Sequence, residues 1–185
     1  MLASPDLSRR FFLRGKVTTA SKANSLVIRP PWAQSESFFV EACSRCDDCI
    51  SACPQSIIIR GVGGFPKISF KLGECTFCME CIKVCKTGAL DATLLNKKIN
   101  QKKIEQVAWN LDISIHSKCL SLNAVVCRAC GDNCETQAIQ FKLKLGGISE
   151  PLITQNDCTG CGACVAVCPI DAVSIKPKLT KSIVT

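Results

Sequence analysis

CTGCGACVAVCP, residues 158–169, is the stretch of this sequence with the clearest chemical meaning. Its cysteines follow the spacing C-x2-C-x2-C-x3-C and end in Cys-Pro, which is the ligand run of bacterial [4Fe–4S] cluster proteins. Three thiolates placed three residues apart on a tight loop can converge on three irons of one cluster. Gly160 and Gly162 let the loop backbone approach the inorganic sulfides, where a Cβ atom would obstruct it. The last cysteine of such a run ligates a second cluster when two are present, so this run predicts a partner run.

Three further cysteine runs follow the same plan, two of them regular and one with an insert. The runs at 43–53 and 75–85 have the same spacing, and their corresponding cysteines lie 32 positions apart, which is an internal repeat. In the irregular run, the insert 120–126 separates the first cysteine from the other three, which predicts an exposed or labile cluster. All sixteen cysteines of the chain are predicted metal ligands: Cys43, Cys46, Cys49, Cys53, Cys75, Cys78, Cys81, Cys85, Cys119, Cys127, Cys130, Cys134, Cys158, Cys161, Cys164 and Cys168. Four ligands per cluster predict four [4Fe–4S] clusters, with no thiol left over.

The crossing of last cysteines between paired runs predicts how the ligands are divided. It assigns Cys43, Cys46 and Cys49 with Cys85 to one cluster, and Cys75, Cys78 and Cys81 with Cys53 to the second. The corresponding sets in the other pair are Cys119, Cys127 and Cys130 with Cys168, and Cys158, Cys161 and Cys164 with Cys134. Lys86 and Glu135 stand where two of the runs lack the proline, so the four clusters need not have equal reduction potentials.

Two other uses of cysteine compete with iron. A disulfide framework suits small secreted proteins, but these spacings are too regular and no signal peptide is expected before them. Zinc also binds C-x2-C pairs, although its sites usually consist of two separated pairs without a third cysteine at the same step. The spacing therefore favours iron–sulfur clusters over disulfides and zinc.

The formal net charge of +8 argues less for nucleic acid than it first suggests. A [4Fe–4S] site with four thiolates contributes about 2−, so four sites would bring the holoprotein close to neutral. Lys and Arg are also spread along the chain without an aromatic-rich basic surface, and we expect no nucleic-acid partner. The sequence contains no phosphate-binding glycine loop and no Ser/His/Asp set, and we expect no enzymatic activity. His116, the only histidine, is predicted to be structural.

The organisation of the chain predicts an α+β protein with two tandem two-cluster modules of short strands and helices. The modules are expected at 37–95 and 113–176, with a linker at 96–112 and a tail at 177–185. Strands are predicted at 37–40, 57–60, 66–70, 113–117, 138–143, 151–154 and 172–175, with Gly146 and Gly147 in a hairpin turn. Residues four and five positions after each last cysteine are aliphatic or small and are predicted to pack against the clusters. Trp109 is predicted to anchor one module on the other.

A basic extension at 1–36 precedes the modules. Residues 8–14, SRRFFLR, are similar to the core of a twin-arginine export signal, but the polar segment that follows lacks an apolar region and a cleavage site. We therefore expect a protein that is not exported and has no transmembrane segment. Arg9 and Arg10 belong either to a peripheral tail or to a segment that helps to recognise a partner carrying a true signal. The segment at 29–32, Arg-Pro-Pro-Trp, predicts an extended connector.

With the start at residues 8–10, the connector at 29–32 and the insert in the third run, the chain resembles the NapF family, the ferredoxin-type accessory proteins of periplasmic nitrate reductase. The resemblance covers nearly the whole chain. It implies a cytoplasmic protein with four [4Fe–4S] clusters that contacts the catalytic subunit of the reductase before export. The implied task is maturation of that subunit, by cluster loading or reduction. The alternative is an electron-transfer polyferredoxin that passes single electrons to a redox enzyme.

Overall fold

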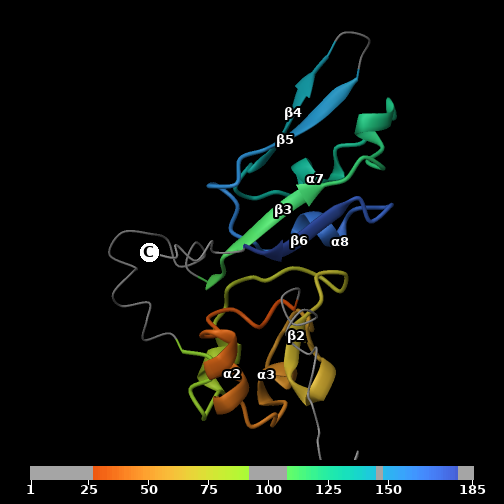
Figure 1. The fold of residues 1–185 in the computed structure, drawn as a ribbon. Coiled ribbons are helices and arrows are strands. Elements are labelled where there is room, and N and C mark those ends of the chain that lie inside the picture. The colour runs from red at the N-terminus through yellow and green to blue at the C-terminus, as the bar shows by residue number, and fades with distance from the viewer. Residues whose placement is uncertain (1–26, 92–107, 145–147, 179–185) are drawn as a thin grey trace, which may run out of the picture.

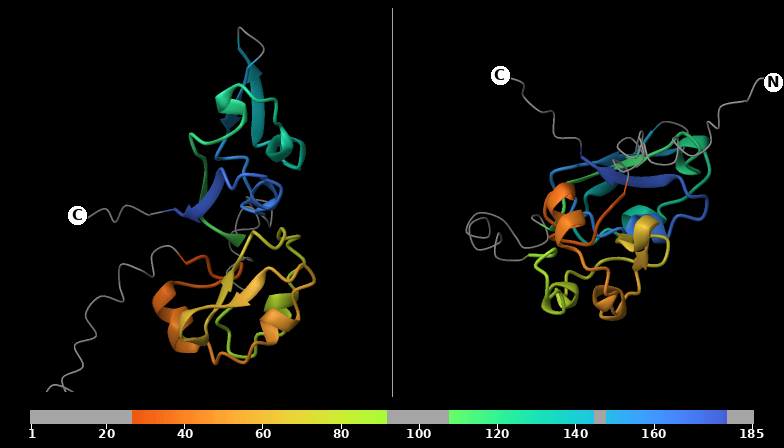
Figure 2. Two further views of the ribbon diagram at one scale, coloured as in Figure 1. Left: turned by 90° about the vertical axis from the view of Figure 1, so that its right-hand side faces the viewer. Right: turned by 60° about the horizontal axis from the view of Figure 1, so that its bottom comes forward.

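The computed structural model describes residues 27–91, 108–144 and 148–178, which form two lobes lying end to end (Figures 1 and 2). The first lobe contains α2 (Glu36–Ala42), α3 (Asp48–Ser51), β1 (Ile58–Arg60), the 3-10 turn η2 (Val62–Gly64), β2 (Pro66–Ile68) and α4 (Glu80–Lys83). The second contains β3 (Leu111–Ile115), η3 (Ser121–Asn123), α7 (Ala129–Asp132), β4 (Ile139–Leu143), β5 (Ser149–Ile153), α8 (Ala163–Ala166) and β6 (Val173–Pro177). The predicted mixture of short helices and strands is confirmed.

The strands pair into small antiparallel sheets. Strand β1 pairs with β2, β3 with β6, and β4 with β5, which forms a hairpin at the far end of the second lobe (Figure 1). Each of these six strands agrees with its prediction to within two residues at either end. The predicted hairpin turn at Gly146 and Gly147 lies outside the described residues.

The strand predicted at 37–40 is wrong, because these residues belong to helix α2. Phe39 is completely buried, and one helical turn later Ala42 and Cys43 pack against the same core. The backbone N–H of Cys43 donates to the carbonyl of Phe39 at 2.9 Å, which closes the last helical turn. A single buried residue between two partly exposed apolar neighbours fits both a strand and a helix, and here packing one turn further along decides for the helix.

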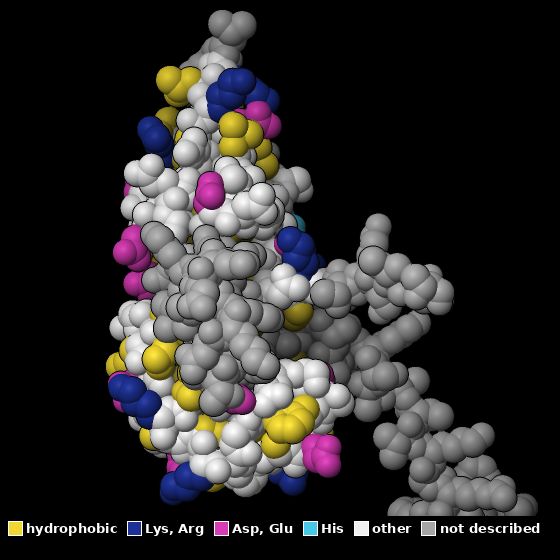
Figure 3. Space-filling view, turned by 90° about the vertical axis from the view of Figure 1, so that its left-hand side faces the viewer, with side chains coloured by type: hydrophobic (Ala, Val, Ile, Leu, Met, Phe, Trp, Pro, Cys, Tyr) yellow, Lys and Arg dark blue, Asp and Glu magenta, His cyan; other side chains and the backbone are white. Residues whose placement is uncertain are grey.

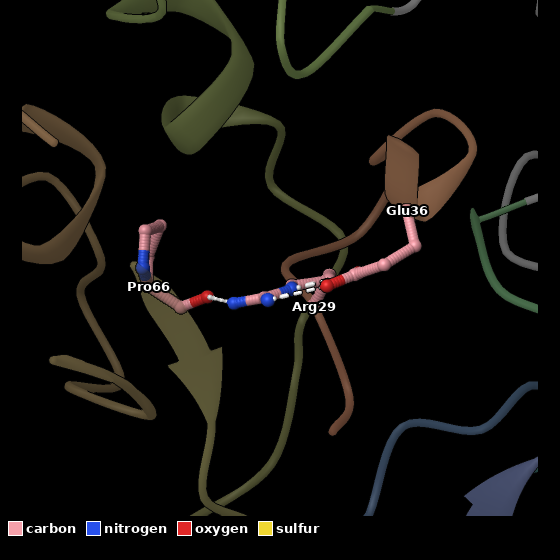
Figure 4. Close-up of polar contacts among 3 residues, drawn as sticks. All are labelled: Arg29, Glu36 and Pro66. Carbon is pink, nitrogen blue, oxygen red and sulfur yellow. Dashed lines mark hydrogen bonds and ion pairs between the residues drawn. The ribbon is translucent and has the colours of Figure 1, made fainter. Parts of the chain in front are cut away.

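The connector before α2 is held by Arg29 (Figure 4). Its guanidinium binds both carboxylate oxygens of Glu36, with Nε at 2.9 Å and Nη2 at 2.5 Å, and it donates to the carbonyl of Pro66 at 3.1 Å. The same group lies over the rings of Phe39 and Phe65, at 5.0 and 5.4 Å from their centroids. Arg29 thus ties the connector to both α2 and β2, a role that suits the planar fork of arginine.

The apolar positions after each last cysteine form the core, as predicted. The residues at the fourth and fifth positions are all at most 5% exposed: Ile57, Ile58, Ala89, Leu90, Ala138, Ile139, Ala172 and Val173. The residue just before each pair has a positive φ, at Ser56, Gly88, Gln137 and Asp171. A left-handed turn therefore follows every last cysteine and directs the chain back into the core.

The two lobes meet at a close backbone contact. The N–H of Cys75 donates to the carbonyl of Cys161 at 2.8 Å. Beside it, the ring of Phe70 lies so near Gly162 that an added Cβ would be 2.0 Å from a ring carbon. Trp109 meets Phe70 and Phe77 edge-on, at 5.7 and 5.9 Å between centroids, so its ring packs on the first lobe; that it anchors one module on the other stays a prediction.

Several predicted segments fall on residues that the structure does not describe: residues 1–26 of the extension, which include Arg9 and Arg10, most of the linker at 96–112 and most of the tail at 177–185. The histidine, His116, is exposed and bonds the hydroxyl of Ser174 at 2.8 Å. In the described ranges, no helix has the length and apolar character needed to cross a bilayer. On the face drawn in Figure 3, basic side chains lie scattered among acidic ones.

Candidate metal centres

The loop inside each regular run turns through two left-handed residues. They lie two and four positions after the first cysteine, at Arg45 and Asp47, Phe77 and Met79, and Gly160 and Gly162, with φ between 54° and 89°. These turns make the loop tight, so that three cysteines spaced three residues apart face one side. Sequence reasoning explained the two glycines by close approach to sulfide, whereas the structure shows that they also relieve backbone strain. In the regular runs at 43–53 and 75–85, larger residues occupy the same left-handed conformation.

The irregular run builds its loop differently. Arg128, between Cys127 and Cys130, has an ordinary negative φ, and the insert instead contains a left-handed residue at Ala124. The insert forms the short turn η3 and is held by the hydroxyl of Ser121, which donates to the carbonyl of Ser149. The cysteines of this run are no more exposed than the others, because the exposed thiols are Cys46 and Cys78 of the regular runs.

The cysteines gather in four sets, and each set draws its members from two runs. We name them set 1 (Cys43, Cys46, Cys49, Cys85), set 2 (Cys53, Cys75, Cys78, Cys81), set 3 (Cys119, Cys127, Cys130, Cys168) and set 4 (Cys134, Cys158, Cys161, Cys164). Set 1 lines a space of about 590 Å³, set 2 one of about 350 Å³ and set 3 one of about 320 Å³, each partly open to solvent. In these three spaces the cysteines are grouped as the crossing rule predicts.

Set 4 is identified by the mutual influence of its thiols. Burial is the main cause that raises the pKa of Cys164, and Cys161 and Cys158 raise it further, followed by Cys130 and Cys134. Cys134 also raises the pKa of Cys158, again after burial and Cys161. The last cysteine of the irregular run therefore lies beside the three cysteines of the final run.

The remaining sets show the same electrostatics. Burial, together with the nearby thiolates of Cys43, Cys46 and Cys85, raises the pKa of Cys49 to about 11. Burial is likewise the first cause of a raised pKa, to about 12 at Cys75 and Cys81 and to about 11 at Cys130. Buried thiols that crowd one another stay neutral without a cation, and metal binding must displace their protons.

The spacing of the cysteines along the chain fits a cluster better than a single zinc ion. Zinc holds its thiolates at about 2.3 Å, which demands four sulfurs around one point. Within the described ranges, which include every cysteine, no three Cys, His, Asp or Glu side chains are placed to hold one metal ion. All sixteen thiols are free of disulfides. Four sulfurs spread around a cavity are the donor set that a [4Fe–4S] cluster requires.

The four sets form a row through both lobes. Cys81 of set 2 interacts with Cys49 of set 1, and Cys164 of set 4 interacts with Cys130 of set 3. The backbone hydrogen bond between the lobes joins sets 2 and 4. The order in space is therefore set 1, set 2, set 4 and set 3, which differs from the order along the chain.

Backbone N–H groups near the cysteines are arranged to donate to sulfur. The N–H groups of Phe77, Leu90 and Ala172 lie 3.4, 3.4 and 3.1 Å from the Sγ atoms of Cys75, Cys85 and Cys168. Such bonds stabilise a thiolate and a metal-bound sulfur alike. Sequence reasoning did not identify these donors, because they depend on the left-handed turns beside the cysteines.

Comparison with known proteins agrees with this geometry. The family of 4Fe-4S dicluster domains matches residues 42–89 and 125–172, one match in each lobe. The ferredoxin-type protein NapF of Escherichia coli K12 is 41% identical over 169 residues, covering 91% of this chain and 94% of that protein. NapF of Haemophilus influenzae is 42% identical, covering 92% and 94%.

A more distant relative and the solved structures complete the comparison. The ferredoxin-type protein NapG of Escherichia coli K12 is 28% identical over 207 residues, covering 94% of this chain and 87% of that protein. No solved structure matches the chain. Two dicluster domains and sixteen cysteines fit four [4Fe–4S] clusters. The chain therefore belongs to the 4Fe-4S dicluster ferredoxins, among the ferredoxin-type proteins of the NapF family.

Proposed function

We propose that this protein is a four-cluster accessory factor that matures the catalytic subunit of periplasmic nitrate reductase in the cytoplasm, before that subunit is exported. The observation that carries the proposal is the identity of 41–42% with NapF proteins over more than nine tenths of the chain. In this proposal, sets 1 to 4 are the ligand sets of the four clusters, and the two-cluster modules are residues 37–95 and 113–176. A bound [4Fe–4S] cluster takes up or releases one electron at a time.

The structure favours two ways in which such a factor could act. The exposed thiols Cys46 and Cys78 lie on the outside of sets 1 and 2, where a partner can reach a ligand and receive a cluster. The alternative function, electron transfer, is favoured by the row of four sets across the contact between Cys75 and Cys161. A continuous row suits passage of single electrons between partners at its two ends.

The experiment that tests the proposal is anaerobic mixing of the reconstituted full chain with the cytoplasmic precursor of the reductase. Binding is measured first, and then the iron and sulfide content of each separated partner. Binding with transfer of iron and sulfide supports cluster loading. Binding with oxidation of the chain's clusters, and iron retained, supports electron delivery. Absence of binding to the precursor contradicts the maturation role and leaves the electron-transfer function with another partner.

The double variant Arg9→Ala/Arg10→Ala tests whether the extension helps to recognise the precursor. If the extension helps to bind the precursor, this double variant binds more weakly while its iron content is unchanged. Equal affinity would mean that these arginines belong only to a peripheral tail.

A further inference from the structure

Trp32 is a buried residue whose indole N–H has no acceptor. Its side chain is 5% exposed, and Nε1 is fully buried without a hydrogen-bond partner among the described residues. A buried donor that stays unpaired destabilises the fold. The same residue has a φ of 59°, a left-handed conformation that is strained for a bulky side chain. Trp32 therefore carries two local costs at once.

The backbone around Trp32 holds the ring in a fixed place despite these costs. Its N–H donates to the carbonyl of Ala108 at 2.9 Å, and its carbonyl accepts from Asp91 at 3.2 Å. The ring meets Phe77 edge-on, with 6.5 Å between centroids. The neighbouring Ala33 pairs with Leu90 in an isolated antiparallel bridge. The position of the indole is thus set by contacts from three different segments.

The space beside the indole is the set 2 cavity. Trp32 lines it together with Pro31 and with the four cysteines of set 2. None of those four sulfur atoms accepts the indole N–H, because Nε1 has no partner of any kind in the described part of the chain. An acceptor for the indole N–H would therefore have to come from a group bound in the cavity. An inorganic sulfide can accept such a hydrogen bond.

Two other buried atoms show that Trp32 is exceptional. Trp109 belongs to the same core, yet its Nε1 donates to the carbonyl of Arg29 at 3.0 Å. Asp47 Oδ1 also lacks a partner, but the other oxygen of that carboxylate pairs with Arg60. Among the described side chains, only Trp32 combines full burial of its single donor with a place on the wall of a cysteine cavity.

We propose that the N–H of Trp32 donates a hydrogen bond to a sulfide of the cluster held by set 2, and that it raises the reduction potential of that cluster. One-electron reduction makes the cluster more negative, so a fixed donor stabilises the reduced form more than the oxidised form. Trp32 is a positioning and tuning residue and no metal ligand. The proposal rests on the ligand assignment of set 2 and is independent of the role in nitrate reductase maturation.

The test is the variant Trp32→Phe, which keeps an aromatic ring, although a smaller one, and removes the N–H. The holoprotein is titrated anaerobically with dithionite while the signals of the reduced clusters are followed by electron paramagnetic resonance. One of the four potentials is expected to fall by about 59 mV, a tenfold change in the one-electron equilibrium. Trp109→Phe is the matched control, since its N–H is satisfied by a backbone carbonyl, and it should shift none of them. Four unchanged potentials in Trp32→Phe would overturn the proposal.

A second measurement does not depend on Trp32→Phe, and it decides the case if that variant binds too little iron to be titrated. The unaltered protein is labelled with indole-¹⁵N tryptophan, and coupling between ¹⁵N and the reduced clusters is sought by pulsed electron paramagnetic resonance. One coupled nitrogen that persists in Trp109→Phe is the expected result, and absence of coupling refutes the hydrogen bond. An error in the set 2 ligands would instead appear if Cys53→Ser and Cys75→Ser altered different paramagnetic signals, whatever the behaviour of Trp32.

Discussion

The contact between the lobes can be tested by replacing Gly162 with alanine. A Cβ at this position would lie 2.0, 2.4 and 2.6 Å from Cδ1, Cγ and Cε1 of Phe70, where carbon atoms normally stay about 3.5–4.0 Å apart. Phe70 is 6% exposed and packs on Trp109, so the ring cannot move away without disturbing the core. We expect this overpacking to cost about 1–3 kcal/mol.

The alanine would also suffer backbone strain, because φ at Gly162 is +89°. Strain of this kind costs about 1–2 kcal/mol. Gly88→Ala separates the two effects, since Gly88 has a φ of +71° near another cysteine run and its added Cβ would meet nothing within 4 Å. The difference between the two variants should therefore isolate the clash of about 1–3 kcal/mol with Phe70.

The assay is the rate of cluster loss in urea, followed anaerobically by the iron–sulfur absorbance. A rate is preferred because unfolding with cofactor loss is irreversible and defines no single equilibrium free energy. When opening is fast and reversible before the loss, 1–3 kcal/mol corresponds to a loss about 5- to 150-fold faster in Gly162→Ala than in Gly88→Ala. Phe70→Ala removes the ring with which the new Cβ clashes. The double variant Gly162→Ala/Phe70→Ala should therefore lose its clusters more slowly than the sum of the two single effects predicts.

Two results would contradict this prediction: equal rates of cluster loss in Gly162→Ala and Gly88→Ala, or simply additive effects of Gly162→Ala and Phe70→Ala. Either result would mean that the ring of Phe70 does not press on the ligand loop. The close packing between the lobes would then contribute little to cluster retention.

Three further outcomes follow from the same structure. If last cysteines cross between runs, Cys85→Ser should alter the same paramagnetic signal as Cys43→Ser and leave the signal altered by Cys75→Ser unchanged; a change shared with Cys75→Ser would refute set 1. Arg29→Lys loses the two-pronged contact with Glu36, so it should cost about 1–2 kcal/mol and lower the urea concentration that removes half of the iron–sulfur absorbance; no change would show that this ion pair is unimportant. Removal of iron by a chelator should abolish much of the circular dichroism of helices and strands, because the cysteines pack among the core residues of both lobes; a native-like spectrum without iron would contradict metal-dependent folding.

Local sequence was enough to predict the clusters and most of the strands. Cysteine spacing fixes which thiols can face one site, and an aliphatic pair after each last cysteine indicates where the chain enters the core, as at Ile57 and Ile58. These features depend on residues close together in the chain, and nearby dihedral angles and burial patterns are what a sequence expresses directly. The exception is α2, for which a strand is predicted, because burial of Phe39 alone fits both the two-residue period of a strand and the 3.6-residue period of a helix.

Tertiary structure decided what depends on residues far apart. The spatial order of the four sets follows from the backbone contact between Cys75 and Cys161, and the wall of the set 2 cavity includes Trp32 from the connector. The unpaired N–H of Trp32 could not be inferred from spacing, because whether a donor finds an acceptor depends on every segment packed around it. The sequence alone therefore determined what this protein binds, and long-range packing determined how the four sites are placed and which side chains surround them.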